Sequence, residues 1–419
     1  MTKGSTSGRT AAMPFIMVTV LLDMMSIGII APVLPKLIGS FMGSGADTSF
    51  AYGAAQAAFA IAQFFSASIL GALSDRYGRR PVLLLGLLGM SVNYFVTALA
   101  TEFWMLLAVR VMGGAVCANI AVANAYVADI TQPKDRARNY GMLGAMFGLG
   151  FILGPVTGGL LGNMNVHWPF FLAGALCLIN TVYGFFVLPE SLPQERRRAV
   201  DWVRANPFSV LSRLRKLQGL EQLLWILGLS ILAQGCLHTS WFLYTEFKFG
   251  WTPKDNGISL FVVGLMAVLV QGGLLRQIQK RMALDRIVRI GLVSATLAYA
   301  GYGLVPVGWL MYVVIVANVF GYMVQPGLQS VVSNSVDPSR QGEAMGAVSS
   351  LNSVAAVLGP ILSAPMLATV SHYPLGDWRI GAPFYLCATI QLVAAIIGFR
   401  YFSRPRHVDD DTLAGRASA

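Results

Sequence analysis

A chain of 419 residues with 55% hydrophobic and only 12% charged side chains is too apolar for a soluble domain, in which about a quarter of the residues carry charge. The formal net charge of +11 would suit a nucleic-acid-binding protein, but the basic residues lie in short segments between long apolar runs, as in membrane proteins. The sequence therefore predicts an all-α integral membrane protein in contact with lipid, and no nucleic acid as a partner.

Twelve apolar runs are long enough to cross a bilayer core of about 30 Å as helices. The segment 190–219 is the one long, charged interruption, and it divides the runs into two groups of six. We expect two pseudo-symmetric six-helix halves, 13–189 and 220–403, joined by this cytoplasmic linker and flanked by an N-terminal segment 1–12 and a tail 404–419. The expected spans are 13–41, 52–73, 80–100, 103–127, 142–163, 168–188, 221–245, 256–275, 286–305, 309–333, 343–370 and 380–402.

The basic residues are concentrated on one side of the expected membrane. Both termini, the stretch around Arg79 and the segment 190–219 are rich in Lys and Arg, whereas the connections on the other side hold few. Cytoplasmic loops carry this excess. We therefore expect a multi-pass protein of the cell membrane with both termini in the cytoplasm.

Asp23 lies near the middle of the first expected span. An acid at that depth costs a few kcal/mol unless it is paired, protonated or facing water, so such residues often mark an ion or substrate path. We expect Asp23 to take up and release a proton. The alternative is a polar contact within the helix bundle.

A short charged stretch, from Gly71 to Pro81, separates the second and third spans. We expect it to be a loop that acts as a latch, in which Asp75 meets the positive N-terminal end of a neighbouring helix and a cytoplasmic arginine. The alternative is an ordinary basic loop. The candidate gating residues are Gly71, Asp75, Gly78, Arg79 and Arg80.

Arg110 lies within the fourth expected span. A buried guanidinium keeps its charge and needs an acceptor. We consider it a partner in proton coupling, with a structural clamp on helix-end carbonyls as the alternative.

The fifth span is rich in glycine. Glycines four residues apart allow two helices to approach closely, and a proline within the span removes a backbone hydrogen bond. Close packing alone would explain this pattern. The residues concerned are Gly150, Gly154, Pro155, Gly158 and Gly159.

Other polar and aromatic residues at span depth could line a central substrate cavity, although each could equally form an interhelical hydrogen bond or pack against its neighbours. His238 could also be a second proton carrier. The candidates are Gln63, Asn93, Asn119, Asn124, Phe147, Gln234, His238, Trp241, Gln325 and Gln329.

No cofactor or metal is predicted. The four cysteines stand singly in apolar runs, and no phosphate-binding G-x-x-x-x-G-K-[ST] loop is present, so neither a metal site nor an ATP site is expected. The four histidines are scattered and do not supply the cluster that an intramembrane enzyme would need. A transporter is favoured over an enzyme, and a receptor that binds without transporting remains as an alternative.

The stretch from Gly71 to Pro81 resembles the signature loop between helices 2 and 3 of the major facilitator superfamily. Arg110 with Gly114, and the run from Gly148 to Gly159, resemble the helix-4 and helix-5 motifs of its antiporters. The resemblance implies twelve helices in two parallel repeats, a gating role for the loop, a coupling role for Arg110 and export rather than import.

Within that superfamily the chain looks most like the tetracycline/proton antiporters, through the loop after the second span, the stretches Ala125–Thr131 and Leu188–Ser191, and the motif around Arg340. Three positions depart from that group. It has an acid where Asn93 precedes Tyr94, a histidine in helix 8 and an acid in helix 9, and this chain has none of these. The departures weigh against tetracycline itself as the substrate.

We therefore expect a monomeric transporter that exports an amphipathic small molecule of the drug-efflux kind in exchange for protons, by alternating access. The alternative is an importer or facilitator of a small metabolite, which would need no change of fold.

Overall fold

The computed structural model describes residues 5–43, 45–117, 119–131, 135–197, 220–336 and 341–403. The described part is helical and contains no strand. Most of the expected linker, from residue 198 to 219, the tail 404–419 and the first four residues of the expected N-terminal segment lie outside the described residues.

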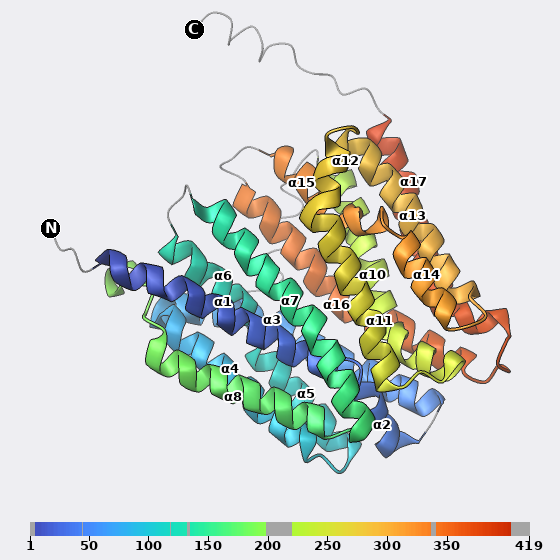
Figure 1. The fold of residues 1–419 in the computed structure, drawn as a ribbon, viewed down its shortest axis with the longest axis horizontal. Helices are drawn as coiled ribbons and strands as arrows, with labels where there is room; N and C mark the ends of the chain where they lie inside the picture. Colours follow the sequence, from blue (N-terminus) through green and yellow to red (C-terminus); the bar gives the residue numbers. More distant parts are fainter. Residues whose placement is uncertain are drawn as a thin grey trace, which may run out of the picture.

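Two bundles lie side by side, one from each half of the sequence (Figure 1). The first contains α1 (Ser5–Ile30), α2 (Leu34–Met42), α3 (Ala46–Tyr77), α4 (Arg79–Ala98), α5 (Phe103–Val116), α6 (Asn119–Ile130), α7 (Arg136–Met164) and α8 (Trp168–Val187). After η2 (Gln194–Arg196), the second contains α10 (Glu221–Phe249), α11 (Pro253–Leu269), η3 (Val270–Leu274), α12 (Leu275–Gln279), α13 (Leu284–Leu304), α14 (Trp309–Ala317), η4 (Gly321–Met323), α15 (Val324–Asn334), α16 (Gln341–Val370), η6 (Trp378–Gly381) and α17 (Ala382–Phe402).

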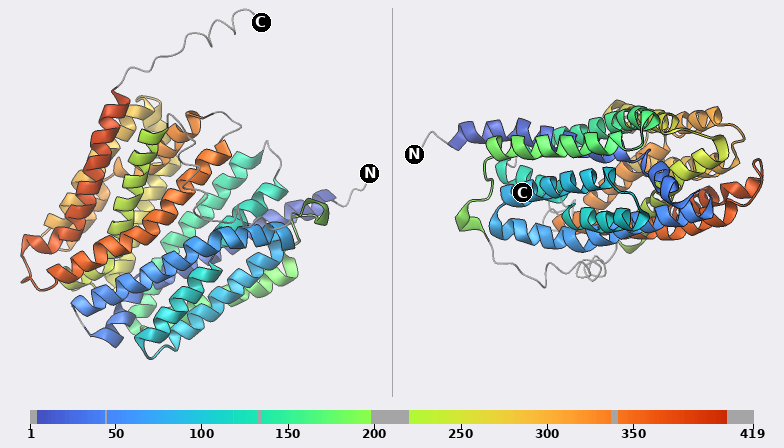
Figure 2. Two further views of the ribbon diagram at one scale, coloured as in Figure 1. Left: turned by 180° about the vertical axis from the view of Figure 1, so that it is seen from behind. Right: turned by 90° about the horizontal axis from the view of Figure 1, so that it is seen from below.

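Ten helices in the described part are long and apolar enough to cross a membrane, counting α1 with α2, α11 with α12 and η6 with α17 as single spans. The pair of α14 with η4 and α15 is an eleventh candidate, bent by 52°. The expected fourth span is the pair of α5 and α6, of which α5 is a shorter apolar helix. Each expected span thus has a helix or a broken pair of helices, and the predicted helical membrane fold is confirmed (Figure 2).

Three spans expected to be single helices are broken. The first breaks at residues 31–33, because Pro32 has no backbone N–H to donate and disfavours helical geometry at Ala31. The fourth expected span is divided into α5, which ends at Val116, and α6, which begins at Asn119. In the tenth, Asn318 follows the last turn of α14, and Pro326 lies in the first turn of α15, where its missing N–H breaks no hydrogen bond of that helix.

The prediction of a charged loop from Gly71 to Pro81, between the second and third spans, is also wrong, because most of these residues are helical. Helix α3 ends at Tyr77 and α4 begins at Arg79, so Gly78 alone forms the turn between the two helices. Pro81 lies in the first turn of α4, where its missing N–H breaks no helical hydrogen bond.

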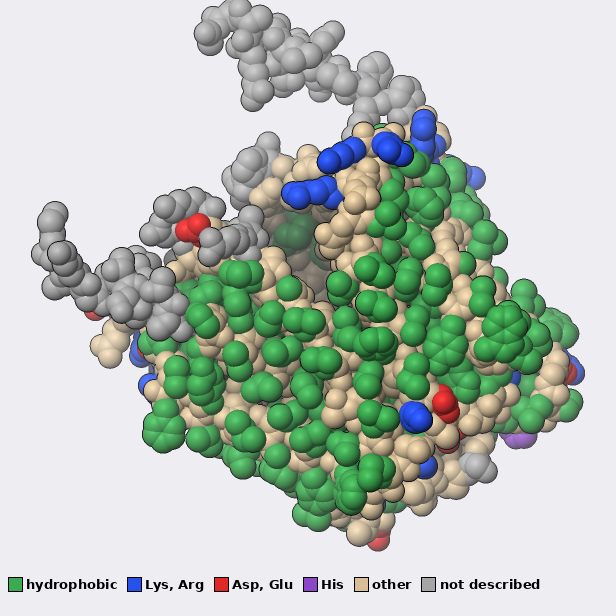
Figure 3. Space-filling view, viewed as in Figure 1, with side chains coloured by type: hydrophobic (Ala, Val, Ile, Leu, Met, Phe, Trp, Pro, Cys, Tyr) green, Lys and Arg blue, Asp and Glu red, His purple; other side chains and the backbone are tan. Residues whose placement is uncertain are grey.

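The two ends of the molecule differ in charge. We call the end that carries the exposed side chains of Arg76, Arg276, Lys280 and Arg281 the basic end, and the opposite one the far end. At the basic end a hollow opens between the two bundles, beside a group of Lys and Arg side chains (Figure 3).

At the far end the two bundles are in close contact. A Cβ added at Gly159 of α7 would lie 2.5 Å from the Pro253 carbonyl oxygen at the start of α11, and one at Gly257 of α11 would overlap the Pro155 carbonyl oxygen. A Cβ on Gly53 of α3 would likewise overlap the side chain of Ala364 in α16.

Toward the basic end the same helices have open space beside them. A Cβ added at Gly71 of α3, Gly144 of α7, Gly272 of η3 or Gly346 of α16 would meet no atom within 4 Å. The bundles are therefore closed against each other at the far end and separated at the basic end.

Substitution of two glycines in α7 tests the packing of α7 against α1 within the first bundle. Gly158→Val would push a side chain into the Ile29 backbone of α1, whereas Gly144→Val points into open space. Because overpacking typically costs about 1–3 kcal/mol, we expect Gly158→Val to lower the thermal unfolding temperature in detergent. Gly144→Val carries the same change of helix propensity and should unfold close to wild type. Equal effects of the two variants would contradict the packing described.

Candidate functional site

Asp23 of α1 is buried within the first bundle, with 4% of its surface exposed. Its carboxyl group interacts electrostatically with Tyr94 of α4, Cys117 at the end of α5 and Cys177 of α8. The acid therefore faces the centre of the first bundle, among four helices.

Arg110 of α5 is also buried, with 8% of its surface exposed. The centre of its guanidinium lies 5.8 Å from the ring centroid of Phe59 in α3, and it interacts electrostatically with Tyr94 and Tyr52. Tyr94 interacts with Asp23 as well. The two predicted coupling residues thus lie within electrostatic range of the same tyrosine.

Side chains of α3 and α4 hold the α5 backbone on both sides of Arg110. The Asn93 amide donates a hydrogen bond to the Val109 carbonyl oxygen. The Gln63 amide donates to the Cys117 carbonyl oxygen at 3.3 Å, at the helix end. Asn93 and Gln63 are candidates for the substrate cavity. Both instead form interhelical hydrogen bonds, which was the alternative for these residues.

The other cavity candidates lie on several helices. Trp241 of α10 is buried, its Nε1 donates to the Ser259 hydroxyl at 3.0 Å, and its ring packs edge-on against Tyr302. The Asn119 side chain is outside the described residues. The rest divide between the bundles, Asn124 and Phe147 being in the first and Gln234, His238, Gln325 and Gln329 in the second.

The glycines predicted to allow close helix approach form a column along α7. A Cβ added at Gly150 would lie 2.7 Å from the Leu21 carbonyl oxygen of α1, and one at Gly154 would lie 2.7 Å from that of Met25. Gly158 continues the column, while Gly159 faces α11 instead. These residues thus set the spacing of α7 from α1, and that of the two bundles at the far end.

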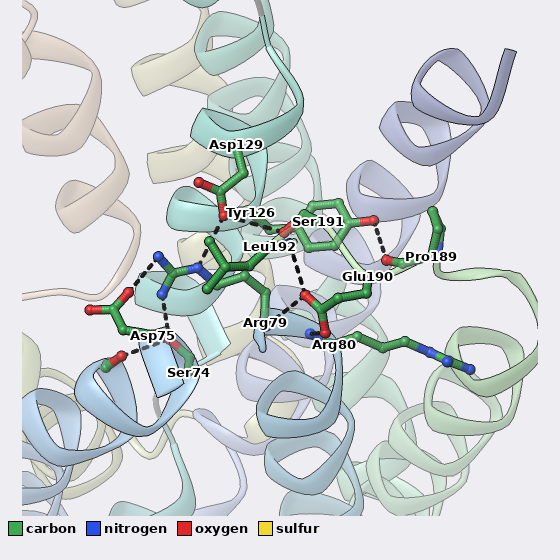
Figure 4. A network of polar contacts seen from close by, with 11 residues as sticks. Ser74, Asp75, Arg79, Arg80, Tyr126, Asp129, Pro189, Glu190, Ser191 and Leu192 are labelled. Atoms are coloured by element: carbon green, nitrogen blue, oxygen red, sulfur yellow. Dashed lines mark hydrogen bonds and ion pairs between the residues drawn. The ribbon is translucent and has the colours of Figure 1, made fainter. Parts of the chain in front are cut away.

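A network of charged side chains joins α3, α4, α6 and the segment after α8 at the basic end (Figure 4). Arg79 contacts the Asp75 carboxylate at 2.6 Å and the Asp129 carboxylate at 3.1 Å. It also donates to the Ser74 hydroxyl at 2.6 Å, and Ser191 donates to Asp129 at 3.3 Å. Arg79 therefore links three segments of the first bundle.

Glu190 caps the N-terminus of α4. Its carboxylate accepts the backbone N–H groups of Arg79 at 2.9 Å and Arg80 at 3.3 Å, which have no partner within the helix. A negative charge at a helix N-terminus is also favoured by the helix dipole. The capping fixes the beginning of the segment that leads to the second bundle.

Gly78 makes this capping possible. Its φ of +107° is in the region that favours glycine. A Cβ at this position would also overlap the Glu190 carboxylate. Both the turn between α3 and α4 and the approach of Glu190 depend on the missing side chain.

Around Asp75, the contacts in this structure differ from those expected of the latch. Beside this stretch, the helix N-terminus in contact with a carboxylate is that of α4, and the acid is Glu190 rather than Asp75. Asp75 contacts Arg79 one turn along the chain. Sequence reasoning missed Glu190 and Asp129 as members of the cluster. Their signal in the sequence was weak: Glu190 is an acid just after the sixth expected span, and Asp129 is one just after the fourth.

The model of the Major Facilitator Superfamily matches residues 16–360 and 308–417. The chain belongs to the Major Facilitator Superfamily. It is 36% identical to the tetracycline resistance protein, class C, of Escherichia coli over 377 residues, 90% of this chain and 94% of that protein. It is 30% identical to multidrug resistance protein 2 of Bacillus subtilis, over 84% of this chain and 87% of that protein.

Among solved structures, the chain resembles that of the human organic anion transporter MFSD10 (TETRAN) with a TM-score of 0.70. The two are 25% identical, and the match covers 93% of this chain and 99% of the other. The family and its tetracycline-resistance branch, both inferred from short motifs, are confirmed by matches over most of the chain.

A double substitution tests the capping of α4. Replacing Glu190 by Ala should destabilise the protein by about 1 kcal/mol, the usual size of a helix cap. Gly78→Ala should also destabilise it, through backbone strain and displacement of Glu190. Because both changes remove the same contact, the loss in the double variant should be smaller than the sum of the single losses, measured by thermal unfolding. Glu195→Ala is the control, and additive losses would show that the two residues act independently.

Proposed function

We propose that this protein exports an amphipathic small molecule across the cell membrane in exchange for protons, by alternating access between its two bundles. The observation that carries the proposal is the match over most of the chain to a tetracycline resistance protein, together with a buried acid and a buried arginine at the same tyrosine. Resistance requires export, so the importer alternative is not favoured.

The state of the two bundles supports alternating access. The hollow at the basic end would let a molecule enter between the bundles, while the contacts of α7 with α11 and of α3 with α16 block the far end. If the basic end faces the cytoplasm, as the positive-inside rule indicates, this is the state that loads cargo for export, with both termini in the cytoplasm. Transport would then require the far-end contacts to separate.

Asp23 is our candidate for the proton carrier. A carboxylate buried at this depth is costly to keep ionised, so its charge depends on what surrounds it in each state. α1 contacts α7 along the glycine column, and α7 also forms the far-end contact with α11. Protonation of Asp23 is thus placed to influence the helices that open and close.

The substrate class follows from the relatives and from one departure. The relatives are named for resistance to tetracycline and to multiple drugs, which favours a drug-like amphipathic substrate for this chain. Asn93 stands where the tetracycline group has an acid, and its amide is bonded to the Val109 backbone. We infer a monomer whose substrate is drug-like and differs from tetracycline.

Proton movement in liposomes tests the function. Purified protein would be reconstituted and challenged with a tetracycline, a lipophilic cation and an uncharged amphipathic drug, while internal pH is recorded. We expect compound-dependent proton movement in wild type and its loss in Asp23→Asn. Asp47→Asn, which neutralises an exposed acid at the start of α3, should behave as wild type. Unchanged movement in Asp23→Asn would show that this residue is structural.

Cysteine labelling tests which side is open. All four native cysteines are buried, so wild type should react little with a membrane-impermeant maleimide. We expect Gly144→Cys, which faces open space, to react in inside-out vesicles and not in intact cells. Thr101→Cys, exposed in the far-end turn before α5, should show the opposite pattern. Labelling of Gly144→Cys from the outside of cells would reverse the orientation proposed.

A further inference from the structure

The guanidinium of Arg110 has hydrogen-bond donors that nothing in the described part of the chain accepts. Its Nε and Nη2 atoms are buried and have no hydrogen-bond partner among the described residues. The ring of Phe59 offers it a face rather than an acceptor. The titratable groups that interact with it there are the phenols of Tyr94 and Tyr52.

Three backbone carbonyls in α5 or at its end, which a structural clamp could use, each accept a hydrogen bond from another side chain. The oxygen of Val109 accepts from Asn93, that of Gly114 accepts from the Ser66 hydroxyl at 2.8 Å, and that of Cys117 accepts from Gln63. The structural alternative for Arg110 was a clamp on helix-end carbonyls. At the end of α5, Gln63 rather than Arg110 makes that hydrogen bond.

The same bonds keep Arg110 where it is. They fix the α5 backbone to α4 before the arginine and to α3 after it. Gly114 also packs so closely on α3 that a Cβ there would overlap the Phe59 carbonyl oxygen. These contacts fix the α5 backbone, and in this structure the Nε and Nη2 donors of Arg110 are buried without an acceptor from the described segments.

A buried cation without acceptors is strongly unfavourable, since arginine keeps its charge and its N–H groups lose water without replacement. A ligand that supplies the missing acceptors would remove this penalty on binding. Two neighbouring oxygens that share a negative charge match the fork of a guanidinium best, because they accept two parallel hydrogen bonds. Phe59, which is half-buried, would offer such a ligand aromatic surface beside the guanidinium.

We propose that Arg110 binds an anionic oxygen pair of the transported molecule, a carboxylate or a comparable enolate, so that the preferred cargo is an amphipathic organic acid. This inference rests on the proposed function, because it assigns a chemical class to the cargo of the same transporter. It gives Arg110 a direct contact with cargo in addition to any part in proton coupling.

Matched acids and amides test the proposal. Purified protein in detergent would be titrated with dansylglycine and dansylglycinamide, which differ only in the carboxylate, by the rise in dansyl fluorescence. A second pair, 2-naphthoate and 2-naphthamide, would be tested by competition and by the increase in unfolding temperature. We expect the acids to bind at least about tenfold more tightly than the amides, about 1.4 kcal/mol.

Substitutions of Arg110 should remove this preference. We expect Arg110→Gln to bind acid and amide alike, and Arg110→Lys to keep a smaller preference because an ammonium lacks the paired donors. Arg289→Gln is the matched control, since it removes another arginine stacked on a phenylalanine, 5.9 Å from the Phe399 ring in the second bundle. It should retain the preference. Size-exclusion profiles and unfolding temperatures without ligand would show that each variant is folded.

The outcomes separate this inference from the proposed function. If the acids bind no better than their amides, or if Arg110→Gln keeps the preference, the anion site is wrong, and proton movement lost in Asp23→Asn would still support export. If the preference is found and depends on Arg110 but no compound, dansylglycine and 2-naphthoate included, moves protons in liposomes, the site stands and the proposed function fails. Equal binding of acids and amides by wild type would also indicate that Arg110 finds its acceptor within the protein in another state.

Discussion

The close approach of α7 to α1 is the contact on which the arrangement of the first bundle depends. Glycines at every fourth residue of α7 leave room for the α1 backbone itself, with carbonyl oxygens where side chains would otherwise be. Gly150 lies against the α1 backbone beside Asp23, so the same contact turns the acid away from α7 and toward α4, α5 and α8. The packing of α7 on α1 therefore also determines which helices Asp23 faces.

Most of the fold could be predicted from the sequence, because the bilayer imposes it. Each span must satisfy its backbone within a helix of sufficient length, so apolar runs mark the helices directly. The glycines of α7 were also visible, since their spacing reflects helix geometry alone. Helix breaks were harder to predict. Pro32 lies in the break between α1 and α2 and Pro326 in the first turn of α15, whereas Pro155 lies inside α7 without ending it.

The site was less predictable, because its contacts join residues that are far apart in the sequence. Nothing near Glu190 indicates that it caps a helix beginning at Arg79. Asn93 and Gln63 looked like cavity residues because they are polar at span depth, but a polar side chain in a bundle usually finds a backbone acceptor on the next helix. Asp23 and Arg110 were identified because charge within a span is costly wherever its partners lie.

The contacts that close the far end have a consequence for the rate of transport. At Gly159 and Gly257, where α7 meets α11 at the far end, the nearest facing atoms belong to the backbone, whereas the Ile152 side chain packs on Gly264 farther along. Separating such surfaces gives up many weak dispersion contacts but withdraws no bulky group from a pocket. The barrier to opening is then low and smooth, and modest binding energy from cargo or a proton can decide which end is open. A closure built from interdigitated leucines would hold one state too firmly to cycle.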